Sequence, residues 1–263
     1  MTRANLEQLL LDESEEAASV AVQVGLDAVP ILERMSGHER VGVRLETMYC
    51  AEALLASKRA ETAHAMIPVL TKSLTDADEQ IASLAATLLY QIEPDGVQNE
   101  LRVAFAKTTH DFVKARIPMI ASFSASPEDR NYWEAILPFQ KDSSIVEGLN
   151  CGLARMGYEP SRTWFCAKLD GAQGTDCEEW FDRAVKLGGE WVYPTLRRCM
   201  THPAVAFTVR ADFDPEDVLV RDLAAWAFLK MSKEKVDFAV AKRRFKSTEL
   251  ERVQAIASKY GKD

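Results

Sequence analysis

The stretch that decides the fold runs from Ile67 to Ile92 and reads "IPVLTKSLTDADEQIASLAATLLYQI". Two apolar segments flank an acidic turn, Thr75–Asp78, and within each segment apolar residues recur three or four positions apart. That spacing predicts an amphipathic helix on either side of the turn. Asp76 precedes Glu79 by three residues, which is the spacing of a helix N-cap and a glutamate that supports it. The stretch therefore predicts two helices folded back to back, the second beginning near Asp76.

The same arrangement of two helices around a polar turn recurs along the chain. Successive second helices are expected to begin 38, 32, 33 and 74 residues apart, and the last step equals two repeats of 37. A period in the thirties built from helix pairs is typical of an α-solenoid, because each pair buries its apolar face only against its neighbours. The related stretches are 29–55, 101–123, 134–157 and 217–231, and the second helices start at Val43, Ile81, Val113, Val146 and Val220.

The repeats share a proline in the first helix, an acidic turn and paired small residues in the second helix. The residues concerned are Pro68, Leu70, Leu74, Asp76, Asp78, Ala85 and Ala86 in the clearest copy, and Pro30, Asp111, Val113, Lys114, Pro138, Asp142, Val220, Arg221, Ala224 and Ala225 in weaker ones. In these residues the chain resembles the HEAT-repeat class, including PBS-lyase-type HEAT-like repeats. The resemblance is close over 25–157 and loose over 158–233. It implies an all-α fold, a right-handed superhelix of about seven to eight helix pairs whose second helices line the concave side.

On this reading residues 1–263 form a single solenoid domain with polar ends. Residues 1–24 would cap the N-terminus and 234–263, which are basic, the C-terminus. Regular repeats would fill 25–157, and aromatic-rich, irregular repeats 158–233. An insertion at 201–215 alternates like a short strand, and it is either a binding loop or a tolerated surface loop. The helix pairs are expected at 4–24, 25–57, 60–93, 95–124, 127–157, 161–188, 189–232 and 234–260.

Composition and charge narrow the function classes. The chain has 32 basic and 40 acidic residues, and because 230–263 carry +5, the remaining 229 residues carry −13. That excess of acid should repel a phosphate backbone and could attract a basic protein, although it could also serve solubility alone. No apolar run is long enough to span a bilayer, and the acidic N-terminus does not look like a secretion signal, so a cytoplasmic location is expected. Five widely spaced cysteines without a CxxC motif indicate reduced thiols.

The aromatic residues are unevenly distributed. Residues 1–100 contain only Tyr49 and Tyr90 of the 22 aromatic residues, whereas 158–193 are rich in them. Aromatic side chains at helical spacing usually fill a core, and tryptophan and tyrosine are also common anchors of protein interfaces. Both interpretations stay open at this point.

Reactive groups do not converge in the sequence. The four histidines fall in different repeats, and His38-Glu39 is the only His-Glu pair, too few for the dinuclear iron site of the HEAT-like deoxyhypusine hydroxylases. HEAT-like DNA glycosylases need a basic groove, and here only the cluster 242–246 could contact phosphate. Relatives of the bilin lyases are not excluded by sequence. We expect no catalytic residue, no metal and no cofactor.

The favoured function is therefore non-catalytic recognition of a basic protein. Long-range attraction would be followed by burial of a few aromatic side chains. A cytoplasmic inhibitor or immunity protein that neutralises a basic toxin is the concrete version; a general adaptor or assembly factor is the alternative, and a HEAT-like enzyme or nucleic-acid-binding protein represents another class. The candidate partner-binding residues are Arg44, Glu46, Gln80, Lys114, Glu147, Asn150, Arg183 and Asp222 on second helices, the anchors Trp164, Trp180 and Trp191, and the steering acids Asp176, Glu178 and Glu179.

Overall fold

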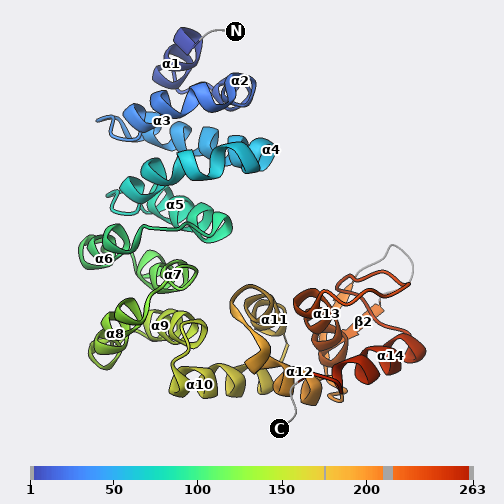
Figure 1. Ribbon diagram of the computed structural model, residues 1–263. Helices are drawn as coiled ribbons and strands as arrows, with labels where there is room; N and C mark the ends of the chain where they lie inside the picture. The colour runs from blue at the N-terminus through green and yellow to red at the C-terminus, as the bar shows by residue number, and fades with distance from the viewer. Residues whose placement is uncertain (1–2, 175, 210–215, 261–263) are drawn as a thin grey trace. The chain divides into compact units, whose positions relative to one another are not determined.

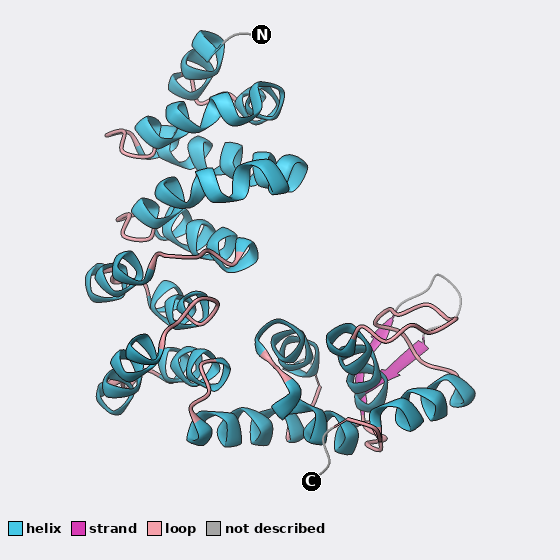
Figure 2. Ribbon diagram, in the orientation of Figure 1, coloured by secondary structure: helices cyan, strands magenta, loops and turns pink. Residues whose placement is uncertain are grey.

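The computed structural model describes residues 3–174, 176–209 and 216–260, and they are mostly helical (Figures 1 and 2). The prediction of a helical protein is confirmed, with one addition, a small two-stranded sheet. The chain divides into two compact units, Met1–Gly152 and Leu153–Asp263, called unit 1 and unit 2 below. Each unit has its own core.

Unit 1 consists of helices joined by short turns. Most of the turns come at or near the positions that the repeat pattern predicts, because capping residues end one helix and begin the next. The elements are α1 (Arg3–Leu11), α2 (Glu16–Val24), η1 (Gly25–Ala28), α3 (Val29–Met35), α4 (Val41–Ser73), α5 (Glu79–Ile92), α6 (Gln98–Lys107), α7 (Asp111–Ala121), α8 (Pro127–Ile136), η2 (Leu137–Phe139) and α9 (Ser143–Arg155), whose last residues belong to unit 2.

Helix α4 has 33 residues and is not straight. A straight helix would place Arg44 about 43 Å from Ser73, at 1.5 Å per residue. Yet the Arg44 guanidinium lies 2.7 Å from the carboxylate of Asp76, only three residues beyond the end of α4. A long side chain and a three-residue turn cannot bridge that separation, so α4 must fold back on itself between Arg44 and Ser73.

Contacts with α5 place the reversal of α4 more narrowly. The amide of Gln80, at the start of α5, donates a hydrogen bond to the Tyr49 hydroxyl at 2.7 Å. Ala56 lies beside Ile92, at the other end of α5. The first part of α4 therefore runs parallel to α5, and the chain turns back after Ala56. This agrees with the break predicted between the pairs 25–57 and 60–93.

Helix starts in unit 1 follow from local capping. The carboxylate of Asp78, not Asp76, caps α5 by accepting from the backbone N–H groups of Gln80 and Ile81 at 3.0 and 3.2 Å. The predicted N-cap is thus displaced by two residues, because Asp76 is held by Arg44. The pair Ser126-Pro127 has the sequence of a helix start, and in the structure Ser126 caps α8 in a capping box with Pro127 at the first helical position. The pair Asp214-Pro215 also has the sequence of a helix start, but it lies outside the described residues.

The core of unit 1 is built mainly from aliphatic and small side chains. Helix α4 packs against α2, α3 and α5, α5 packs against α7, and α6 packs against α7. The paired alanines Ala85 and Ala86 are fully buried, which lets neighbouring helices approach closely. On α9 the approach is closer still, since a Cβ atom added to Gly148 would lie 1.9 Å from the backbone oxygen of Ala115 in α7.

Unit 2 uses aromatic side chains as its core fillers. Phe165, Phe181 and Phe228 are fully buried, and Trp180 nearly so. The core-filling interpretation of these aromatic residues is therefore correct. The elements are α10 (Glu159–Asp170), α11 (Asp176–Leu187), η3 (Glu190–Val192), α12 (Tyr193–Cys199), β1 (Val205–Val209), β2 (Glu216–Leu219), α13 (Val220–Ser232) and α14 (Ser247–Ala257).

Two segments of unit 2 differ from the predicted helix pairs. Strands β1 and β2 pair antiparallel, with Phe207 opposite Val218 (magenta in Figure 2), so the alternating pattern of the insertion forms a strand. Helix α13 begins at Val220, the start predicted for this second helix. The last predicted pair, 234–260, contains one helix, because residues 233–246 are not helical. The buried Phe245 side chain anchors this segment, and its N–H donates to the Asp222 carboxylate at 3.1 Å.

Candidate docking groove

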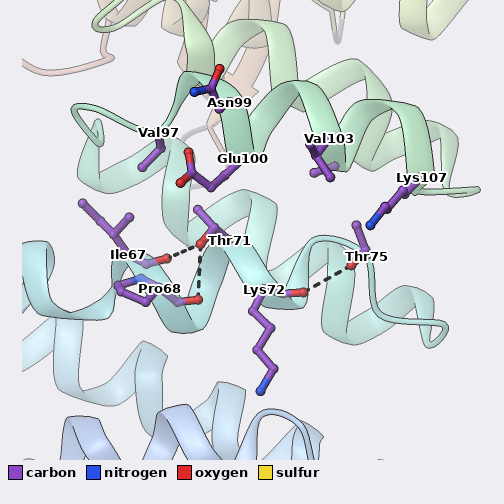
Figure 3. Close-up of a pocket in the computed structure, with 11 residues that line it drawn as sticks. Ile67, Pro68, Thr71, Lys72, Thr75, Val97, Asn99, Glu100, Val103 and Lys107 are labelled. Atoms are coloured by element: carbon purple, nitrogen blue, oxygen red, sulfur yellow. Dashed lines mark hydrogen bonds between the residues drawn. The ribbon is translucent and has the colours of Figure 1, made fainter.

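An open groove of about 590 Å³ lies in unit 1 between the last two turns of α4 and helix α6 (Figure 3). In Figure 3 the two helices run in the same direction, with Ile67 below Val97 at one end and Thr75 below Lys107 at the other. The lining residues are Ile67, Pro68, Thr71, Lys72 and Thr75 from α4 and the turn after it, and Val97, Asn99, Glu100, Val103, Ala104 and Lys107 from α6 and the residue before it.

The apolar lining follows from helical spacing. On α4 the lining residues Ile67 and Thr71 are four positions apart, so they lie on one face of the helix, and Thr75 follows in the turn after it. On α6 the corresponding stripe includes Val103, whose side chain is 50% exposed although it is apolar and β-branched. Pro68 adds an exposed ring that cannot donate a backbone hydrogen bond. The groove thus presents apolar surface that no described segment covers.

The hydroxyl groups of the groove are used within their own helix or turn. Thr71 Oγ1 donates to the carbonyl of Ile67 at 2.9 Å, and Thr75 Oγ1 lies 3.4 Å from the carbonyl of Lys72 (dashed in Figure 3). Among the described residues neither hydroxyl is hydrogen-bonded to a histidine or to Glu100, the carboxylate of the lining. The lining is therefore suited to non-covalent binding.

Two charged side chains of the groove remain available for a partner. Glu100 and Lys107 are exposed, and neither forms an ion pair with another described residue. Lys72 differs, because its ammonium group lies 3.4 Å from the carbonyl oxygen of Glu33, and in Figure 3 its side chain points away from α6. The groove therefore offers one carboxylate toward the Val97 end and one ammonium at the Thr75 end.

The predicted site residue Arg44 has a structural role. It was expected to be exposed on a second helix, but its side chain is only 14% exposed and forms two hydrogen bonds with the Asp76 carboxylate, at 2.7 and 2.9 Å. Burial alone would raise the pKa of Asp76, but the hydrogen bonds from Arg44 and from the N–H of Asp78, with the charge of Arg44, outweigh burial and lower it. The Arg44 guanidinium also donates to the carbonyl of His38, so the ion pair ties two turns together.

The other candidates in unit 1 are divided between surface and interior. Gln80 is exposed and bonded to Tyr49, and Lys114 and Glu147 are half-buried. Glu46 is also half-buried, and burial followed by repulsion from Glu15 and Glu13 raises the pKa of its carboxyl group. Asn150 was predicted to be exposed; it is buried, and its amide donates to the carbonyl of Val146 at 2.9 Å. These residues do not line the groove.

The three predicted tryptophan anchors of unit 2 form one aromatic cluster. Trp164 and Trp180 meet edge to face at 5.8 Å between ring centroids, and Phe165 links Trp180 to Trp191 at 5.5 and 5.4 Å. Trp180 is buried, so it is a core residue, while Trp164 and Trp191 are half-buried. As an interface anchor Trp180 was expected to face a partner, whereas the structure buries it.

The predicted steering acids are largely engaged inside unit 2. Glu178 accepts a hydrogen bond from Lys242 at 2.8 Å, and Glu179 pairs with Arg183 at 2.5 Å. Asp176, at the start of α11, is exposed.

Asp222 was predicted to lie on an exposed face, but it is fully buried. Its carboxylate accepts from the N–H of Leu219 at 2.9 Å as well as from that of Phe245. The segment 233–246 covers this position, which explains why the pattern of α13 alone was misleading.

The negative charge is not where the tryptophan anchors are. Residues 1–152 contain 23 acidic and 13 basic residues, a net charge of −10, whereas residues 153–263 contain 17 and 19, a net charge of +2. Electrostatic attraction of a basic partner therefore favours unit 1.

Sequence reasoning missed the groove, although one signal for it was present. In α6 the buried residues are Leu101, Ala104 and Phe105, so Val103 falls on the polar face together with Glu100. An apolar β-branched residue in the middle of a polar face is the pattern that would have marked this helix.

The groups that would indicate other functions are limited in the described parts of the chain. No cluster of three or more histidine, cysteine, aspartate or glutamate side chains there could hold a metal ion. Across the same residues, none of the helices combines the length and the apolar character that crossing a bilayer requires. Comparison with known proteins gives no match, either to a protein-family model or to a curated protein sequence.

Proposed function

We propose that the protein is a non-catalytic protein-binding module and that the groove between α4 and α6 is its docking site. The observation that carries this proposal is the uncovered apolar surface of the groove, with Val103 half exposed at its centre. Apolar surface left open to water and flanked by charged residues is typical of protein interaction sites. The hydroxyl groups of the lining are used within the chain, which favours binding over chemistry.

We further propose that the helix pairs of unit 1 form a HEAT-like right-handed stack. The order of contacts supports this, because α4 packs against α2, α3 and α5, and α5 packs against α7. In such a stack the second part of α4 and α6 are first helices of consecutive pairs. The groove would then lie on the side formed by the first helices. The candidate binding residues expected from the sequence lie on the second helices, on the opposite side.

The proposed partner is a basic protein. Unit 1 carries a net charge of −10, so it would attract a basic protein over distances of about 8–10 Å at physiological salt, roughly one Debye length. An inhibitor that neutralises a basic toxin is the specific form we favour. Nucleic-acid binding is less well supported, since Lys242 and Arg243 of the basic cluster are paired with Glu178 and Glu249.

The experiment compares proteins captured from lysate of the native host by three versions of the full chain, with quantitative mass spectrometry as the readout. The versions are the wild type, Val103→Asp and Val205→Asp. Val205 is the matched control, because it is an exposed valine of unit 2, 46% exposed against 50% for Val103. Circular dichroism checks that both variants fold.

We expect basic proteins that wild type and Val205→Asp retain and that Val103→Asp loses, with retention falling as sodium chloride is raised. A charged carboxylate facing a buried apolar contact costs several kcal/mol, which is enough to abolish capture at micromolar concentrations. Equal retention by all three versions would refute the docking site. Partners that are lost with Val103→Asp but are acidic would refute the electrostatic part alone.

A further inference from the structure

We infer that the occupant of the groove is a short amphipathic helix of the basic partner, with a lysine or arginine placed against Glu100. This inference depends on the proposed docking function and specifies the structure and sequence pattern of what binds there. It is carried by the geometry of the two walls and by the positions of the two unpaired charges.

The walls of the groove are both helices, and this determines which backbone conformation can bind. A helix satisfies its own backbone N–H and C=O groups, so neither wall offers an unpaired strand edge to an extended peptide. An extended occupant would leave its own backbone groups without partners on an apolar surface. A helical occupant brings its backbone hydrogen bonds with it and needs only side-chain contacts, which the groove supplies.

The dimensions of the groove fit about three turns of helix. The lining of α4 extends from Ile67 to Thr75, about 12 Å at 1.5 Å per residue, and that of α6 from Val97 to Lys107, about 15 Å. These two stripes run in the same direction in Figure 3. A third helix lying between them would contact both through residues at positions i, i+3, i+4 and i+7.

The charges then fix the pattern on the occupant. Glu100 and Lys107 are seven residues apart on α6, so they lie on the same face about two turns from each other. Val103 and Ala104 occupy the face between them. The complementary occupant has a basic residue opposite Glu100, an acidic residue about two turns away opposite Lys107, and apolar residues in between.

The test uses a display library of random 16-residue peptides, selected on the full-length wild-type protein and counter-selected on Val103→Asp. Selected peptides are synthesised, their affinities are measured by fluorescence anisotropy, and their helicity on binding is followed by circular dichroism. The charge contact is tested by Glu100→Lys, with Glu52→Lys as the control. Glu52 is an exposed residue of unit 1 outside the groove, and this variant has the same net charge as Glu100→Lys.

We expect selected peptides to carry apolar residues at helical spacing with a lysine or arginine on the same face, and to become helical on binding. Their affinity for Val103→Asp should be at least 100-fold weaker than for the wild-type protein. Glu100→Lys should weaken binding about 10-fold, Glu52→Lys less than 3-fold, and exchanging the basic residue of the peptide for glutamate should restore affinity for Glu100→Lys.

Two results would overturn the inference, and they differ in what they say about the proposed function. Peptides that depend on Val103 but are extended, or are indifferent to Glu100→Lys, would refute the helical occupant while leaving the groove as a docking site. If no selected peptide is sensitive to Val103→Asp, the groove is not a peptide-docking site, and the proposed function fails with it.

Discussion

Replacing Gly148 with alanine should destabilise unit 1, although it improves the helix propensity of α9. A Cβ atom at this position would lie 1.9 Å from the backbone oxygen of Ala115 and 2.6 Å from its carbonyl carbon. Restoring an ordinary contact of about 3.4 Å requires α9 and α7 to separate locally by about 1.5 Å. The obstructing atoms belong to the backbone of a packed helix, so no side-chain rotation relieves the clash.

The expected magnitude follows from two opposing effects. Overpacking costs typically 1–3 kcal/mol and more when the neighbour is rigid, whereas exchanging a helical glycine for alanine gains about 1 kcal/mol. We therefore expect a net loss of about 2 kcal/mol, measured by urea unfolding, with faster hydrogen exchange in α7 and α9 measured by mass spectrometry. Gly37→Ala is the control, because its Cβ would lie 2.5 Å from the Nζ atom of Lys72, the flexible end of a side chain that can move away. A Gly148→Ala variant as stable as the wild type would refute the reasoning.

Three further predictions concern buried groups. Arg44→Ala should lower the free energy of unfolding, measured with urea, by on the order of 3 kcal/mol, because it leaves the Asp76 carboxylate unpaired. Arg40→Ala removes an exposed ion pair and should lower it by less than about 1 kcal/mol. Equal losses would contradict the structural role of Arg44. The pKa of Asp76 is lowered in the folded state, so its ionised carboxylate contributes to the free energy of unfolding above about pH 4, and this contribution is lost as the pH falls through the folded pKa. Below about pH 4 the free energy of unfolding should therefore decline less steeply in Asp76→Asn than in the wild type. Parallel declines would contradict this prediction. Burial raises the pKa of Cys50 and of Cys199 to about 12, so a thiol-reactive disulfide reagent at pH 8 should leave both unlabelled until urea is added, whereas labelling in the native state within minutes would show that they are accessible.

The succession of helices was predictable because it is encoded locally. Apolar spacing, prolines and capping residues indicate where a helix begins and ends without knowledge of its neighbours. Even the reversal within α4 falls where the repeat pattern predicts the end of one pair and the start of the next. Strand β1 was also indicated, because the insertion at 201–215 alternates apolar and polar residues like a short strand.

The candidate site was less predictable, because it depends on which faces remain uncovered after packing. Arg44 has the spacing of an exposed residue on a second helix, but it bonds to a carboxylate 32 positions later. Asp222 likewise has the spacing of a surface position, and a segment more than ten residues further along the chain covers it. Val103 shows the opposite case, since it is an apolar residue of a helix and yet is half exposed. Helical periodicity alone does not contain this information.

Lys242 illustrates how poorly a run of like charges in a sequence describes the surface that results. Its single ammonium group lies 2.8 Å from Glu178 and 2.7 Å from Asp182, and 4.9 Å from the centre of the Trp226 ring. Arg243 is similarly held by Glu249, so within the run 242–246 only Arg244 and Lys246 extend into solvent. A polyanionic resin such as heparin would therefore meet about half of the basic side chains that the run contains. The other two, Lys242 and Arg243, form ion pairs that hold one segment of the chain against another.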